Sequence, residues 1–133
     1  MQRFTPFLMF TGRAEEAMNL YTSLFENSKI LGITRYGPKE AGAEGTVVHA
    51  TFTLNGQKYM CIDSSVHHDF DFTPSFSIHV QFESEAEIDR VFAGLTQGGN
   101  VHMPLGRYPL SKKYAWLSDR FGVSWQLDLV DSE

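Results

Sequence analysis

The sequence predicts an α+β fold of two βαβββ modules, whose curved mixed sheets surround a cleft and carry the helices on their outer faces. Two observations lead to this prediction. A short apolar segment enters an amphipathic, helix-like segment twice, about 71 residues apart, which indicates an internal repeat. The segments after each helix alternate between apolar and polar residues, which is the period of a β-strand.

The first module is expected at about residues 4–63. Its helix shows apolar residues at i, i+3, i+4 and i+7, which gives one buried stripe. Asn55-Gly56 predicts a tight hairpin turn between two of its strands. The expected elements are a strand at 6–10, a helix at about 13–26, and strands at 29–36, 47–54 and 57–63.

The second module is expected at about 75–130, after a polar linker at 64–74. Ser84 followed by Glu87 forms a capping-box pattern, so the second helix is expected to start there, and Gly98-Gly99 should end it. Long loops at 37–46 and 103–113 are candidate lids. The expected strands lie at 75–82, 101–104, 114–118 and 123–129.

Each strand has one apolar face, which should lie under a helix, and one mildly polar face. Trp125 falls on the apolar face and is expected in the core. The polar faces either meet water or line a ligand-binding cavity. The residues expected to line that cavity are His49, Cys61, Asp63, Ser77, His79, Trp116 and Gln126.

Composition narrows the class of protein. The 133 residues suit one domain, 1–133, and the net charge of −5 without a basic run argues against nucleic-acid binding. Cys61 is the single cysteine, which excludes an internal disulfide framework and fits a reducing cytoplasm. No segment is long enough to span a membrane, and the N-terminal segment lacks the pattern of a signal peptide.

Three segments carry a family resemblance: FLMF at 7–10, AEEAMNLY at 14–21 and DRFGVSWQ at 119–126. Together they resemble the PhnB-like branch of the vicinal oxygen chelate superfamily, which includes glyoxalase I, extradiol dioxygenases and bleomycin-resistance proteins. The resemblance covers nearly the whole chain. It implies the paired-module fold, and it also implies that two chains pair as a homodimer.

The resemblance also implies where a metal would bind, since each module of the superfamily supplies ligands from its first and last strands. The implied positions are Pro6 and Ser77 on the first strands, and Cys61 or Asp63 with Gln126 on the last. Proline has no side-chain donor, and serine and an amide are weak ligands for zinc, nickel or iron. We therefore expect neither the superfamily metal nor another cofactor, and no metal-dependent glyoxalase activity.

This branch is often labelled 3-demethylubiquinone 3-methyltransferase. The chain has no Gly-rich strand-to-helix loop and no alternating parallel architecture that would hold S-adenosylmethionine, so methyl transfer is not expected. The first hypothesis is a protein that binds a small organic ligand, comparable to the bleomycin-resistance proteins.

The alternative hypothesis is a lyase, isomerase or oxygenase. It would use a displaced metal held among His49, Cys61, Asp63 and His79, or His79 as a general base. Cys61 lacks any cue for activation as a nucleophile, and the favoured alternative is a small, buried apolar residue. The cations of the 103–113 loop, Arg107, Lys112 and Lys113, offer contacts to an anionic ligand.

Overall fold

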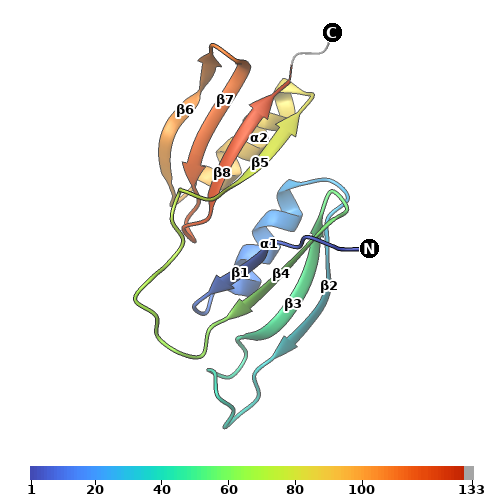
Figure 1. The fold of residues 1–133 in the computed structure, drawn as a ribbon, viewed down its shortest axis with the longest axis vertical. Helices are drawn as coiled ribbons and strands as arrows, with labels where there is room; N and C mark the ends of the chain where they lie inside the picture. The colour runs from blue at the N-terminus through green and yellow to red at the C-terminus, as the bar shows by residue number, and fades with distance from the viewer. Residues whose placement is uncertain (131–133) are drawn as a thin grey trace. The chain divides into compact units, whose positions relative to one another are not determined.

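A computed structural model describes residues 1–130 of the chain (Figure 1). The chain divides into two compact units, and the division between His68 and Asp69 lies inside the predicted linker 64–74. Each unit contains one helix and one four-stranded mixed sheet. The predicted α+β class and its two βαβββ modules are therefore confirmed.

The sheet of the first unit has the order β1-β4-β3-β2. β1 pairs with β4 in parallel, and the other pairs are antiparallel. Asn55 and Gly56 form the predicted hairpin turn, with φ angles of 49° and 81° that suit these two residue types. The elements are β1 (Phe7–Phe10), α1 (Ala14–Leu24), β2 (Lys29–Arg35), β3 (Val47–Leu54) and β4 (Gln57–Asp63).

Helix α1 covers one face of the first sheet. Its buried side chains keep the predicted stripe, and the Tyr21 ring lies 6.5 Å from the ring of Phe52 on β3. Phe52 in turn stacks on Tyr59 of β4 at 5.3 Å between ring centroids. The apolar faces of the strands thus pack under the helix, as expected from their alternation.

The second unit repeats this arrangement with the strand order β5-β8-β7-β6. β5 pairs with β8 in parallel, and the other two pairs are antiparallel. Trp125 is fully buried on the helix side, as predicted. The elements are β5 (Ser77–Phe82), α2 (Glu85–Thr96), β6 (Asn100–Tyr108), β7 (Ser111–Ser118) and β8 (Ser124–Leu129).

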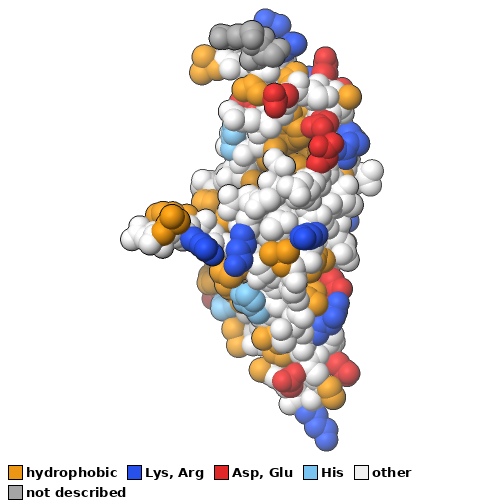
Figure 2. Space-filling model, turned by 90° about the vertical axis from the view of Figure 1, so that its right-hand side faces the viewer, with side chains coloured by type: hydrophobic (Ala, Val, Ile, Leu, Met, Phe, Trp, Pro, Cys, Tyr) orange, Lys and Arg blue, Asp and Glu red, His pale blue; other side chains and the backbone are white. Residues whose placement is uncertain are grey.

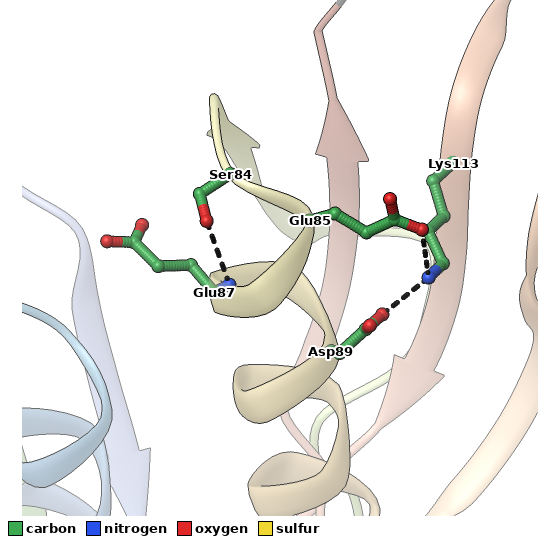
Figure 3. Close-up of polar contacts among 5 residues, drawn as sticks. All are labelled: Ser84, Glu85, Glu87, Asp89 and Lys113. Carbon is green, nitrogen blue, oxygen red and sulfur yellow. Dashed lines mark hydrogen bonds and ion pairs between the residues drawn. The ribbon is translucent and has the colours of Figure 1, made fainter.

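Helix α2 is anchored at its first turn (Figure 3). The Ser84 hydroxyl accepts a hydrogen bond from the Glu87 backbone N–H, while the Glu87 carboxylate points away from Ser84. Lys113 of β7 reaches Glu85 at 3.0 Å and Asp89 at 2.6 Å. These two carboxylates raise the pKa of Lys113, Asp89 having the larger effect. Lys113 therefore joins the sheet to the helix and does not extend toward a ligand from a loop.

The predicted lid at 103–113 is wrong, because this segment is a β-hairpin. β6 continues to Tyr108, and β7 starts at Ser111. The pairing of β6 with β7 shifts register three times, so the period of two is interrupted along β6. The other predicted lid, at 37–46, does lie in the connection between β2 and β3.

The surface carries charges of both signs. On the face shown in Figure 2, basic and acidic side chains are interspersed, and hydrophobic side chains form small groups. Within residues 1–130, no helix has the length and apolar character needed to cross a bilayer. The mixture of charges agrees with the small net charge of −5, and the helices agree with the lack of a membrane-spanning segment in the sequence.

Candidate functional site

The predicted residues of the first unit fall on opposite faces of its sheet. His49 is exposed on the face away from α1, where its ring lies 6.1 Å from that of Phe7. Cys61 is fully buried, and it pairs with Ala50 on the face under α1. The prediction that Cys61 shares a face with His49 is therefore wrong, because the β3–β4 register places Met60, and not Cys61, opposite Thr51 on the open side.

Burial also determines the chemistry of Cys61. Desolvation, and secondarily the charge of Asp63, raises the pKa of its thiol to about 12. A thiol with such a pKa is almost entirely protonated at neutral pH and is a poor nucleophile. Cys61 thus behaves as a small apolar core residue.

Asp63 is also turned toward α1, so its predicted place on the polar face is wrong. Its carboxylate accepts backbone N–H groups from Gly12 at 2.7 Å, Ala14 at 3.0 Å and Val47 at 2.9 Å. Arg13, the N-cap residue of α1, makes no side-chain cap. Asp63 supplies the anionic cap instead, and this position favours a negative charge.

The second unit brings its predicted residues together. His79 of β5, Gln126 of β8 and Trp116 of β7 are register partners, and Met103 of β6 follows Trp116. They form a row across the face opposite α2, which we call the open face of the second sheet. Neighbouring strands are about 4.8 Å apart, so adjacent members of the row lie within mutual reach of one ligand.

One end of the open face is organised around Ser124. The Trp116 indole N–H donates to the Ser124 hydroxyl at 2.9 Å, and the hydroxyls of Ser77 and Ser124 are 2.6 Å apart. His102 lies beside them, with its Nε2 2.8 Å from the Ser118 hydroxyl and its ring 4.7 Å from the Trp116 ring. The position of the Trp116 ring is therefore fixed from two sides.

The other end is organised around Asp128. Its carboxylate accepts a short hydrogen bond from Ser111 and lies 3.5 Å from Nε2 of His79. The Tyr114 hydroxyl donates to Oε1 of Gln126 at 2.8 Å. Burial, followed by the charge of Asp128 and by Tyr108, raises the pKa of Tyr114, so this hydroxyl keeps its proton. The network thus fixes the orientations of Gln126 and His79.

Six members of this network were not among the residues expected to line the cavity: His102, Ser111, Tyr114, Ser118, Ser124 and Asp128. Ser124 and Asp128 do share the predicted polar face of their strand with Gln126. Tyr114 and Ser118 alternate with the predicted Trp116, so extending the alternation along β7 would have found them. His102 lies where β6 changes register, and no periodic pattern points to it. Of the cations that were candidates for an anion contact, Arg107 and Lys112 line a groove of about 450 Å³ at the β6–β7 hairpin.

The residues at the implied metal positions do not fit a zinc, nickel or iron site. Pro6 offers only its backbone carbonyl, which accepts the Met60 N–H. Cys61 and Asp63 face α1, while Ser77 and Gln126 are hydrogen-bonded to neighbouring side chains. Nowhere in residues 1–130 do three or more His, Cys, Asp or Glu side chains converge on a position for a metal ion.

Comparison with known proteins agrees with this architecture. The model of the 3-demethylubiquinone-9 3-methyltransferase family matches residues 2–128. The chain belongs to this family. The predicted resemblance to PhnB-like proteins is confirmed by this match together with the PhnB protein described below. A search of curated proteins found no significant match.

Solved structures extend the comparison of this family member. A putative 3-demethylubiquinone-9 3-methyltransferase, PhnB protein, from Bacillus cereus is 61% identical, with a TM-score of 0.95 over 97% of this chain and 100% of that one. Protein PA1353 from Pseudomonas aeruginosa is 26% identical, with a TM-score of 0.85 over 99% and 100%. A glyoxalase/bleomycin resistance protein from Albidiferax ferrireducens shares the fold, at 16% identity and a TM-score of 0.61 over 96% and 98%.

Proposed function

We infer that this family member binds a small organic ligand on the open face of its second sheet, without the superfamily metal. The observation that carries this inference is the polar and aromatic network on that face. Helix α2 packs on the opposite face of the second sheet. No helix of the second unit therefore covers the network. Sites for small ligands combine apolar and aromatic walls with a few fixed polar groups, and this face has that composition.

The architecture favours binding over methyl transfer. The family description names a methyltransferase, but each unit of this chain is a mixed, mainly antiparallel sheet with one helix. A nucleotide-like cofactor is commonly held at the switch point of a parallel sheet covered by helices on both faces. Side chains on the open face bind and orient a ligand in our proposal, and no step requires a methyl donor.

The proposal is tested by a ligand screen joined to elemental analysis. Thermal shifts of the full chain would be measured against small organic acids, quinones and neutral aromatic compounds, with and without added zinc, nickel or iron. We expect a hit that binds the metal-free protein and weakens in Trp116→Ala. Stoichiometric metal that is required for binding, or a hit insensitive to every open-face substitution, would contradict the proposal.

A second candidate function is supported by the contact of His79 with Asp128. A carboxylate beside an imidazole holds the ring in one orientation, as a general base requires. In this variant of the proposal, the ligand is a substrate of a lyase, isomerase or oxygenase. Turnover abolished by His79→Ala, with ligand binding largely retained, would favour the enzyme over the binder.

The partner and the location complete the proposal. Each sheet has two edge strands, β1 with β2 and β5 with β6, and such edges are covered in many proteins by a second chain. We therefore include a homodimer in the proposal. We also place the protein in the cytoplasm, where a single reduced cysteine is common.

A further inference from the structure

The open face of the second sheet offers a hydrogen-bond donor whose direction is fixed. Tyr114 donates its hydroxyl proton to Oε1 of Gln126, and the amide Nε2 therefore points away from Tyr114. In the described part of the chain, no residue accepts a hydrogen bond from Nε2. Gln126 consequently has two N–H groups for a ligand acceptor.

The adjacent position offers a matching acceptor. Nε2 of His79 faces the Asp128 carboxylate at 3.5 Å, and because a carboxylate oxygen accepts, the tautomer with its proton on Nε2 suits this contact. Nδ1 is then an acceptor, and within residues 1–130 it has no hydrogen-bond donor. His79 keeps 44% of its side chain exposed, which leaves this nitrogen accessible.

The third member of the row provides a flat surface. Trp116 is the register partner of Gln126, and its indole nitrogen is already engaged by Ser124. The ring therefore offers its face or edge to a ligand and no further donor. Planar ligands gain favourable aromatic contacts in such a position.

Charge on this face disfavours an anion. Asp128 is negative, while Lys113 lies on the helix side and binds Glu85 and Asp89. By alternation along β7, Lys112 shares the face of Tyr114 and Trp116, but it lines the hairpin groove together with Arg107 and is not part of the row.

We propose that His79, Gln126 and Trp116 bind a neutral, planar aromatic lactam. Its carbonyl accepts from Nε2 of Gln126, its N–H donates to Nδ1 of His79, and its ring packs on Trp116. A lactam carries its carbonyl and its N–H on adjacent atoms. Gln126 and His79 are register partners on neighbouring strands, so their side chains can contact both groups. This proposal rests on the ligand-binding function inferred above and names its ligand class.

The experiment uses isoquinolin-1(2H)-one as the probe and the full chain at pH 8. The chain has two tryptophans, so its indole N–H region holds two NMR signals, and Trp116→Phe assigns them. We expect the lactam to shift the Trp116 signal and to leave that of the buried Trp125 unchanged. The N-methyl lactam, which lacks the N–H donor, should bind about tenfold more weakly, the effect of one hydrogen bond.

Substitutions then test each contact separately. His79→Phe should weaken the lactam about tenfold and remove its advantage over the N-methyl lactam. Gln126→Met should weaken the lactam and leave 1-methoxyisoquinoline, which has no carbonyl, unaffected. Gln81→Met is the matched control, because Gln81 lies on the same strand two residues from His79 but outside the row. It should not change the affinity.

Three outcomes would overturn the proposal. Equal affinity for the lactam and its N-methyl form would exclude the His79 contact. Tighter binding of 1-naphthoate through Trp116 would show a preference for anions, and the binding function itself would then stand. No shift of the Trp116 signal by any of these compounds would exclude the ligand class, and the wider screen would then decide the binding function separately.

Discussion

Two buried carboxylates hold backbone groups in place, one in each unit. Asp63 accepts three backbone N–H groups in the first unit. In the second, Asp119 accepts the N–H groups of Phe121 and Val123 and the indole N–H of Trp125. Charged acceptors make the stronger hydrogen bonds, and a buried donor left without one is costly. Both residues are therefore structural.

The first prediction concerns Asp63. Asp63→Asn replaces one acceptor oxygen by a donor that faces N–H groups, so we expect a loss of about 3 kcal/mol in the free energy of unfolding. Chemical denaturation measures it. Asp71→Asn, an exposed change of the same type in the linker, should stay within about 0.5 kcal/mol. Similar losses in both variants would contradict the structural role of Asp63.

The second prediction concerns Cys61. With a pKa of about 12 in place of the usual 9.0, its thiolate fraction at pH 8 falls about 1000-fold. Alkylation of the native protein should be slower than that of the denatured protein by at least this factor, as measured by mass spectrometry. The same shift makes stability fall as the pH rises from about 9 to 12, because the unfolded thiol ionises first. Rapid native alkylation would show that Cys61 is accessible.

At the scale of elements, the third prediction concerns the start of α2. Ser84→Ala removes the cap on the Glu87 N–H and should cost about 1 kcal/mol. Glu87→Gln is the matched control, since the Glu87 carboxylate points away from Ser84 (Figure 3), and it should change stability little. Thermal unfolding compares the two. A loss in Glu87→Gln that is larger than the loss in Ser84→Ala would indicate that the Glu87 side chain also caps the Ser84 backbone N–H, as in a reciprocal capping box.

Local patterns predicted most of the elements. The helix stripes and the Asn55-Gly56 turn depend on neighbours in sequence, and the hairpin strands 47–54 and 57–63 match β3 and β4. The second hairpin was not predicted, because its register shifts break the alternation that reveals strands. The cap of α1 could not be predicted either, since Asp63 lies 49 residues from Ala14.

In the candidate site, too, the predictions from local alternation were correct, and those that depend on strand pairing were not. Ser77, His79, Trp116 and Gln126 lie on the predicted face, because their strands alternate clearly. Cys61 was assigned to the wrong face, since β4 mixes apolar and polar side chains and its orientation depends on pairing with β3. Whether any of these residues binds a ligand stays a prediction.

The fourth prediction concerns the whole molecule. If the edge strands are covered by a second chain, light scattering at micromolar concentration should give twice the mass of one chain. The small net charge of −5 does not oppose such association. A mass of one chain across this concentration range would exclude the homodimer.

The carboxylate of Asp63 also couples the local opening of two segments of the first unit. The three amide protons that it holds come from Gly12, Ala14 and Val47, which belong to the entry of α1 and the start of β3. Such protons exchange with solvent only when their shared acceptor is displaced. Gly12, Ala14 and Val47 should therefore exchange their amide hydrogens for deuterium in a single opening event, with one common protection factor.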